Sequence, residues 1–184
     1  DIVAEHLYTR HFCSLFDVSH MGRILVDGPE AVPFLQHVLS SNVMALDLNQ
    51  AQYAIIPNEN GGAVDDAYLY RFEEERYLLV VNAANTDKDL AHLNEQIKSY
   101  DARMTVITGD YAAIAVQGPK AKEILQVLSG GKAVTEPVKN ALNTLDFEGR
   151  TVRVAKTGYT GEPIGYEVYV ASAEAEWLWN RLIE

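Results

Sequence analysis

The chain has 184 residues, 48% of them hydrophobic, which is enough to bury one large core or two smaller ones. Its 15 basic and 26 acidic residues give a net charge of −11, which argues against nucleic acid or anionic lipid as a partner, because both require clustered Lys and Arg. No apolar run approaches the roughly 20 residues of a membrane span, and the first twenty residues contain no basic-then-apolar leader. The single cysteine, Cys13, excludes an internal disulfide. We therefore expect a reducing compartment: the cytoplasm of a bacterium, or the mitochondrial matrix of a eukaryote.

The amino-terminal part of the chain predicts strands followed by a helix. Residues 15–26 are rich in β-branched and aromatic residues but are interrupted within residues 19–22, so they predict two strand segments with an irregular middle. Asp27-Gly28-Pro29 then predicts a turn and a helix start. The apolar residues of this helix recur at helical spacing: Val32, Leu35, Val38 and Leu39.

A β-hairpin is predicted next, from strand Tyr53–Ile56 through the loop Pro57–Gly62 to strand Ala63–Phe72. The Asn-Gly pair in that loop is a strong hairpin signal. Alternation along the second strand places four residues on one face, namely Val64, Asp66, Tyr68 and Tyr70. It places four others on the opposite face, namely Asp65, Ala67, Leu69 and Arg71. After a turn, residues 77–81 predict a strand that is buried on both faces.

The remainder of the chain alternates helices with short strands. Asn85 or Thr86 caps a predicted helix with Asp87 and Asp89 in its first turn. Its apolar residues are Leu90, Leu93 and Ile97. Strands are expected at residues 104–107, 112–116, 151–155 and 166–170. Gly118-Pro119 opens one further helix that Gly130-Gly131 ends, and Ser172 starts the last. This mixture favours an α+β fold of mainly antiparallel sheets with flanking helices over a doubly wound parallel fold.

Three polar segments are candidates for chemistry: residues 16–22, 58–66 and 157–162. Nucleotide-binding, zinc-protease and serine-hydrolase motifs are absent from the sequence, which leaves a site centred on a carboxylate. Asp66 shares its face with two tyrosines, a setting suited to a flat heteroaromatic ligand with N–H donors. The alternative is a solvated strand edge whose tyrosines cover a core. His20 is more often a hydrogen-bonded structural residue than a base or ligand, and Cys13 is more often core than nucleophile.

Five strings resemble the glycine cleavage T-protein family and occur in the same order as in that family. They are Cys-Ser-Leu-Phe-Asp-Val-Ser-His-Met-Gly (13–22), Asn-Glu-Asn-Gly-Gly-x-x-Asp-Asp (58–66), Val-Val-Asn-Ala-Ala-Asn (80–85), Gln-Gly-Pro-Lys-Ala (117–121) and Thr-Gly-Tyr-Thr-Gly-Glu (157–162). The resemblance covers nearly the whole chain. It implies that the chain is the amino-terminal, folate-binding half of such a protein, with the carboxyl-terminal domain absent. This half is expected to form either one domain over residues 1–184 or two interleaved subdomains, the second at roughly residues 22–110.

The resemblance also implies an activity. Members of the family are aminomethyltransferases, in which the lipoyl arm of the H-protein delivers an aminomethyl group and tetrahydrofolate, the co-substrate, attacks its methylene carbon. Ammonia leaves, and the products are 5,10-methylenetetrahydrofolate and a reduced lipoyl arm. The expected partners are therefore lipoylated H-protein and tetrahydrofolate, with no nucleic acid, membrane or metal.

Site residues follow from the same resemblance. It assigns Asp66 as the catalytic carboxylate, which contacts the folate nitrogens and orients the attacking amine. It places six other residues around the folate: Met21, Tyr53, Tyr70, Asn82, Tyr159 and Glu167. The segment from Gly161 to Glu167 is one residue longer than the common family pattern, so Glu162 is the alternative to Glu167 for holding the pterin.

Two other functions remain open at this point. Relatives in the same family use folate to demethylate other substrates, although the strings at residues 11–22 and 60–66 favour the glycine cleavage branch. A non-catalytic folate-binding module, in which Asp66 is structural, is the second alternative.

Overall fold

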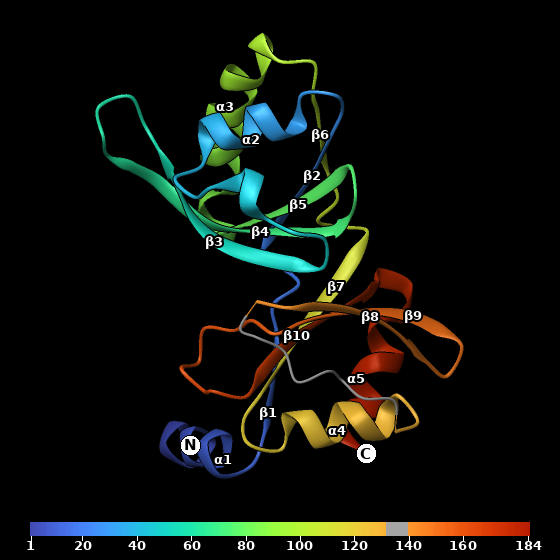
Figure 1. Ribbon diagram of the computed structural model, residues 1–184. Helices are drawn as coiled ribbons and strands as arrows, with labels where there is room; N and C mark the ends of the chain where they lie inside the picture. Colours follow the sequence, from blue (N-terminus) through green and yellow to red (C-terminus); the bar gives the residue numbers. More distant parts are fainter. Residues whose placement is uncertain (132–139) are drawn as a thin grey trace. The chain divides into compact units, whose positions relative to one another are not determined.

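The computed structural model describes residues 1–131 and 140–184, and these form two compact units (Figure 1). The first unit comprises Asp1–Ser19 and Gly109–Glu184, and the second comprises His20–Thr108. The second unit is therefore inserted into the sequence of the first. Among the described residues, no helix is long and apolar enough to cross a membrane.

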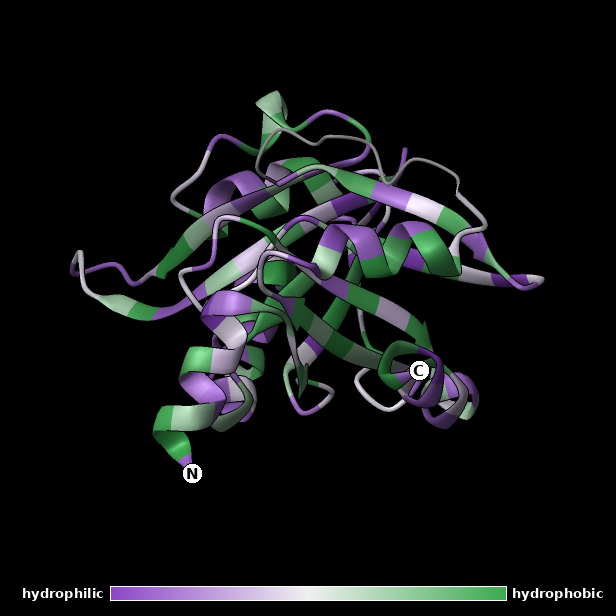
Figure 2. Ribbon diagram, turned by 90° about the horizontal axis from the view of Figure 1, so that it is seen from below, coloured by the Kyte–Doolittle hydropathy of each residue, from purple (hydrophilic) through white to green (hydrophobic). Residues whose placement is uncertain are grey.

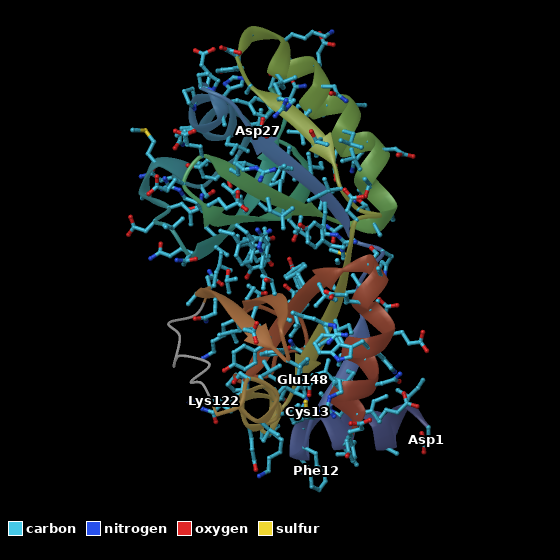
Figure 3. All side chains as sticks on the ribbon, turned by 90° about the vertical axis from the view of Figure 1, so that its right-hand side faces the viewer. Asp1, Phe12, Cys13, Asp27, Lys122 and Glu148 are labelled. Atoms are coloured by element: carbon cyan, nitrogen blue, oxygen red, sulfur yellow. The ribbon has the colours of Figure 1, made fainter. Side chains whose placement is uncertain are left out.

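The second unit contains a five-stranded antiparallel sheet. Its strands, in spatial order, are β3 (Gln50–Pro57), β4 (Ala63–Glu73), β5 (Arg76–Val81), β2 (Gly22–Asp27) and β6 (Arg103–Val106). At the end of β2, Asp27, labelled in Figure 3, forms an ion pair with Arg103 of β6 at 3.0 Å. The β3–β4 hairpin turns as its Asn-Gly pair predicts, because Gly61 adopts φ +79° and Asn58 Oδ1 accepts hydrogen bonds from the N–H groups of Asn60 and Gly62.

Helices α2 (Ala31–Val38) and α3 (Thr86–Gln96) cover one face of this sheet (Figure 1). Single 3-10 turns accompany them at η1 (Val43–Ala45), η2 (Ala83–Asn85) and η3 (Ile97–Ser99). The core between the helices and the sheet includes Phe34 and Leu35 of α2, Leu93 of α3 and Leu69 of β4, none of which has exposed surface. This core fixes one face of β4 and leaves the other face for Asp66.

The first unit contains a second five-stranded antiparallel sheet. Its strands, in spatial order, are β1 (Ser14–Asp17), β7 (Tyr111–Gln117), β10 (Gly165–Ala171), β9 (Arg150–Ala155) and β8 (Leu142–Phe147). Helices α4 (Ala121–Leu128) and α5 (Ala175–Ile183) pack on a core that includes Val116, Val154 and Val168. Helix α1 (Ile2–His11) precedes β1, and the 3-10 turn η4 (Ser172–Glu174) precedes α5. Figure 2 shows apolar and polar residues intermixed along the strands and around the helices, as amphipathic elements require.

The predicted fold class is confirmed: the sheets are antiparallel and helices flank them. The two strand segments expected in residues 15–26 are β1 and β2, but they belong to different sheets and to different units. The strand expected to be buried on both faces is β5, in which Tyr77, Leu79, Val80 and Val81 are all buried. The last helix begins as the 3-10 turn η4 and becomes α-helical at Ala175.

Helix α1 and strand β8 were not predicted from the sequence. Helix α1 buries only Thr9, and its larger apolar residues Ile2, Val3, Leu7 and Tyr8 are exposed rather than packed on a core. Strands β8 and β9 join through Glu148-Gly149, whose φ values of +54° and +82° form a two-residue hairpin turn. Glu148, labelled in Figure 3, accepts a 2.6 Å hydrogen bond from Arg181 of α5, which anchors this turn.

Val64 also differs from the alternation expected for β4. Its side chain packs against the same core as Ala67 and Leu69, whereas the sequence placed it beside Asp66. The register shifts at Ile56/Pro57, where the strand pairing skips a residue, and this bulge reverses the side-chain direction near the start of β4. From Asp66 onward the alternation holds.

Candidate functional site

The candidate site in the second unit lies on the face of β3 and β4 that is opposite to the core. Tyr53 of β3 is directly across from Tyr68 of β4, and their rings pack edge to face with centroids 5.7 Å apart. Tyr70 continues the row at 5.8 Å from Tyr68, and Phe72 stacks on Tyr70 at 6.0 Å. Tyr70 is only 1% exposed, whereas Tyr53 is 46% exposed, so the aromatic row is accessible at the end where Asp66 lies.

Asp66 is half-buried at that accessible end and is held at both oxygens. The Tyr53 hydroxyl donates to Asp66 Oδ2 at 2.8 Å, and the Asn82 amide donates to Asp66 Oδ1 at 2.6 Å. The side chain therefore does not extend freely into solvent, as the alternative of a solvated strand edge would require. Three residues assigned from the sequence, Tyr53, Asp66 and Asn82, are joined by direct hydrogen bonds.

Asn82 is placed by the junction between β5 and α3. Its backbone is extended, and its carbonyl oxygen accepts from the Asn85 N–H at 3.0 Å and from the Thr86 hydroxyl at 3.1 Å. These contacts fix the residue at the end of the strand. Its Nδ2 reaches both neighbouring carboxylates, with Asp65 Oδ1 at 3.0 Å and Asp66 Oδ1 at 2.6 Å.

Neutral groups hold both carboxylates, since no Lys or Arg among the described residues forms an ion pair with Asp65 or Asp66. A carboxylate oriented by hydroxyl and amide donors keeps its negative charge available to a bound ligand. The hydrogen bond to Asp66 is also the main reason why the pKa of Tyr53 is raised above its ordinary value of 10.0, so this hydroxyl stays a donor at neutral pH. The arrangement can accept N–H groups or stabilise a developing positive charge.

Asp89 is a buried polar residue that the sequence analysis placed only in the first turn of a helix. It has no exposed surface, and both of its carboxyl oxygens are buried without a hydrogen-bond donor, as is Oδ2 of Asp65. A signal was available: Asp89 precedes Leu93 by four residues and therefore shares its helix face. Asp65 was likewise given no role, although its Oδ1 accepts from both Asn82 and Asn85.

Glu167, in the first unit, lies on the face of β10 opposite to the core. It alternates with the core residues Tyr166 and Val168 and is buried, at 9% exposure. Its Oε2 accepts hydrogen bonds from the Thr157 hydroxyl and, at 3.3 Å, from the Tyr169 hydroxyl. Glu167 is therefore a buried carboxylate held by hydroxyl donors, as Asp66 is held by a hydroxyl and an amide.

Glu162, the alternative to Glu167, has a different partner. It forms an ion pair with Arg10 of α1, and the same guanidinium donates to the Thr160 carbonyl oxygen at 2.8 Å. This pairing neutralises the Glu162 charge and ties the segment 157–162 to α1. Glu162 is thus paired with a cation, whereas the partners shown for Glu167 are hydroxyl groups.

The loop that carries Tyr159 is organised by Gln117, at the end of β7. Gln117 is 1% exposed, and its Nε2 donates to the carbonyl oxygens of Thr157 at 3.2 Å and Tyr166 at 3.1 Å. Its Oε1 accepts from the Thr160 hydroxyl at 2.8 Å. Tyr159 itself is 64% exposed on this loop. Sequence reasoning identified the Gln-Gly-Pro string but assigned Gln117 no function.

The structure also places the other residues that the sequence analysis singled out. Met21 is half-buried in the turn before β2, and His20 beside it is exposed. Cys13, labelled in Figure 3, is half-buried, and burial raises the pKa of its thiol to about 11, which keeps it protonated and unreactive at neutral pH. Met21 thus belongs to the second unit with Tyr53, Asp66, Tyr70 and Asn82, while Tyr159 and Glu167 belong to the first.

Fold and geometry together define an α+β protein of antiparallel sheets with an oriented carboxylate on an aromatic sheet face, an arrangement typical of a small-molecule site. The chain belongs to the GCVT N-terminal domain family, whose model matches residues 1–184. This finding confirms the family resemblance drawn from the five sequence strings.

Curated relatives carry the name aminomethyltransferase. The protein from Thermus thermophilus is 45% identical over 183 residues, covering 100% of this chain and 52% of its own length. The protein from Deinococcus deserti is 44% identical over 184 residues, covering 98% of this chain and 50% of its own length. The chain therefore spans about half the length of the curated relatives it matches.

A solved structure shows the same fold. Glycine cleavage system aminomethyltransferase T from Bartonella henselae is 32% identical, with a TM-score of 0.87 over 99% of this chain and 48% of that chain. Heterotetrameric sarcosine oxidase from Corynebacterium sp. U-96 is similar at a TM-score of 0.67 and 13% identity, which shows a shared fold alone.

Proposed function

We propose that this chain is the folate-binding half of a glycine cleavage aminomethyltransferase, which transfers the one-carbon unit of S-aminomethyl-dihydrolipoyl H-protein to tetrahydrofolate. The products are 5,10-methylenetetrahydrofolate, ammonia and the reduced lipoyl arm. The observation that carries the proposal is the Asp66 carboxylate, fixed by Tyr53 and Asn82 on an aromatic face, in a chain 45% identical to a curated aminomethyltransferase.

The chemistry of the transfer explains why a fixed carboxylate is useful. A folate nitrogen gains positive charge as it attacks the methylene carbon, and a nearby negative charge stabilises that change. A carboxylate that also accepts an N–H from the folate holds the nitrogen in register with the carbon. Asp66 suits both tasks because its two oxygens are oriented by neutral donors and its charge is not cancelled by a cation among the described residues.

The other assigned residues bind rather than react in this proposal. Tyr53 and Met21 lie against the folate, Asn82 orients Asp66, and Tyr70 packs beside Tyr68 in the aromatic row that faces the ring system. Glu167 accepts the N–H pair of the pterin's amino-pyrimidine edge through charge-assisted hydrogen bonds, and Tyr159 packs on the ring system. The functional partner is lipoylated H-protein, and the expected compartment is the cytoplasm.

Replacing Asp66 by Asn tests the proposal in the complete protein. The amide preserves the shape and the acceptor oxygen but removes the charge, so kcat/KM for methylenetetrahydrofolate formation should fall on the order of 10²- to 10³-fold. The thermal unfolding midpoint should change little, because Asp66 is only half-buried. Turnover is followed by the appearance of methylenetetrahydrofolate with aminomethylated H-protein as donor.

Glu59→Gln, on the exposed loop of the same hairpin, is the matched control, since it removes one negative charge without touching Asp66. Its turnover should equal that of the unmodified protein. Unchanged turnover in Asp66→Asn would contradict the catalytic assignment. Tetrahydrofolate binding measured by calorimetry without any transfer activity would instead favour the non-catalytic folate-binding module, and transfer from a methylated amine in place of H-protein would favour a demethylase.

A further inference from the structure

Asp89 of α3 is buried without the donors that a buried carboxylate normally has. It has no exposed surface and lies on the helix face that packs on β4. No N–H or O–H group of the described residues donates to either of its carboxyl oxygens, or to Oδ2 of Asp65. The neighbouring group that acts on it is the Asp65 carboxyl, whose Oδ2 is also buried without a donor.

Two carboxyl groups can hydrogen-bond each other only when one of them carries a proton, because an ionised carboxylate has no donor. Burial, followed by the hydrogen bond and the charge of Asp65, raises the pKa of Asp89 to about 7. Burial also acts to raise the pKa of Asp65, but hydrogen bonds from Asn82 and Asp89 outweigh it and the pKa is lowered. In a pair of this kind, the raised pKa of Asp89 and the lowered pKa of Asp65 assign the proton to Asp89.

We propose that Asp89 is a positioning residue, whose carboxyl proton holds Asp65 as the ionised acceptor that orients the Asn82 amide onto Asp66. The proposal concerns the proposed folate site and so rests on that function for its catalytic meaning. Its structural content, a proton shared by two buried carboxyls, can be tested without folate.

A continuous series of contacts connects Asp89 to the site. Asp65 Oδ1 accepts from Asn82 at 3.0 Å and from Asn85 at 3.1 Å, and in the proposed pair its other oxygen, Oδ2, is left to accept the Asp89 proton. The same Asn82 amide donates to Asp66 Oδ1 at 2.6 Å. If Asp65 lost its donor from behind, its side chain could rotate, and the Asn82 amide would no longer be held between the two carboxylates.

The charged groups around Asp89 determine how much its ionisation would destabilise the site. Asp65 and Asp66 act on it from β4, and both are acidic. Lys88, on its own helix, is the opposing charge, and its Nζ donates to the Val64 carbonyl oxygen at 2.6 Å. Helix η2 contributes the neutral Asn85, and His37 of α2 contacts Gln96 at the opposite end of α3. An ionised Asp89 would be a third negative charge beside a single lysine.

This arrangement predicts the sign of a pH effect on stability. Asp89 titrates near 4 in an unfolded chain and at about 7 in the folded protein, so the folded state binds the extra proton between these values. The contribution of Asp89 to the free energy of unfolding is fully present below about pH 4 and is lost as pH rises through 7. Asp89→Asn cannot titrate and should lack that loss.

Thermal unfolding between pH 5 and pH 8 tests the shared proton. The unmodified chain should lose on the order of 5 °C more than Asp89→Asn over this range. Asp87→Asn is the matched control, because Asp87 lies on the same helix turn with its side chain exposed and should keep the full pH dependence. Identical pH profiles for the unmodified chain and Asp89→Asn would overturn the proposal.

The positioning role is tested by a pair of substitutions at the same residue. Asp89→Asn supplies a permanent N–H donor to Asp65, whereas Asp89→Leu has a similar size and no donor. In nuclear magnetic resonance spectra, the Asn82 side-chain amide protons should stay protected from solvent exchange in Asp89→Asn and exchange on the order of ten times faster in Asp89→Leu. Equal protection in the two variants would overturn the role.

Tetrahydrofolate binding by the complete protein supplies the link to function. The dissociation constant should rise on the order of tenfold in Asp89→Leu and stay close to that of the unmodified protein in Asp89→Asn. Equal affinity in both variants would contradict the link. An unmodified protein that binds no tetrahydrofolate would contradict the proposed function, while amide protection and pH-dependent stability would still decide whether Asp89 positions Asn82.

Discussion

At the scale of single residues, the site depends on how donors are distributed among three neighbouring carboxyl groups. Asn82 donates to both Asp65 and Asp66, Tyr53 donates to Asp66, and the pKa of Asp89 is raised chiefly by burial and by Asp65. A small set of neutral donors thereby separates the roles of two adjacent aspartates. Asp66 faces the aromatic row, and Asp65 faces the helix.

The hydroxyl of Tyr53 provides a direct reporter of the Asp66 charge. Because the hydrogen bond to Asp66 is the main cause of the raised pKa of Tyr53, Asp66→Asn should lower that pKa toward 10.0. The titration is measured by nuclear magnetic resonance on protein labelled at the tyrosine ζ carbon. Asp87→Asn should leave the titration of Tyr53 unchanged, and an unchanged Tyr53 in Asp66→Asn would show that the two side chains are not bonded in solution.

Sequence reasoning located Asp66 but not Asp89, and the difference has a physical origin. The period of two along β4 assigns Asp66 and Tyr70 to one face, whatever packs behind the sheet. Asp89 has the sequence features of an ordinary first-turn acid that favours the helix dipole. Its burial follows from the packing of α3 on β4, and its raised pKa follows from that burial and from the neighbouring Asp65; neither is encoded locally.

At the scale of elements, α1 is held to the first unit by its carboxyl end rather than by a buried face. Gly118 is the close-approach point: it adopts φ +136°, and an added Cβ would lie 2.5 Å from the Phe12 carbonyl oxygen and 2.6 Å from that of Thr9. The Phe12 oxygen also accepts from Lys120 N–H at 3.0 Å. Gly118 therefore allows the end of α1 to meet the start of α4.

Gly118→Ala should destabilise the protein by about 2–4 kcal/mol, because it combines strained backbone with a clash against backbone atoms that cannot rotate away. Hydrogen exchange should show the amides of α1 losing protection first. Gly149→Ala is the control: its φ is also positive, at +82°, but nothing lies within 4 Å of the added Cβ. That change should cost about 1 kcal/mol, and equal losses for the two variants would contradict the close-approach explanation.

The elements that were predicted carry local signals, and those that were missed do not. The β3–β4 hairpin has both alternation and an Asn-Gly loop, and α3 has apolar residues at helical spacing. In α1 the large apolar residues Ile2 and Tyr8 are 83% and 57% exposed, so this helix does not use an apolar face to pack on a core. The β8–β9 turn uses Glu148-Gly149 in place of the common Asn-Gly, and its positive φ at Glu148 cannot be read from the residue type.

At the scale of the whole molecule, each unit has its own hydrophobic core. One cluster is centred on Leu35, Leu79 and Leu93, the other on Leu125, Val154 and Val168, and the two share no buried residue. We expect each core to be responsible for the protection of its own sheet.

Truncating one buried leucine in each core tests that expectation. Leu93→Ala and Leu125→Ala each remove a side chain with no exposed surface and should each lower stability by about 2–5 kcal/mol. In native-state hydrogen exchange, Leu93→Ala should mainly weaken protection in β3, β4 and β5, and Leu125→Ala in β7, β9 and β10. Equal loss across both sheets for either variant would show that the molecule unfolds as a single cooperative body.

The placement of the second unit inside the sequence of the first has a consequence for biosynthesis. Strand β1 ends at Asp17, but its partner β7 begins at Tyr111, and the two pair directly, with Asp17 opposite Ile114. All five strands of the intervening unit leave the ribosome before β7 does. Since domains fold as units during synthesis, the nascent chain can complete the aspartate-bearing unit while β1 still waits for its neighbour.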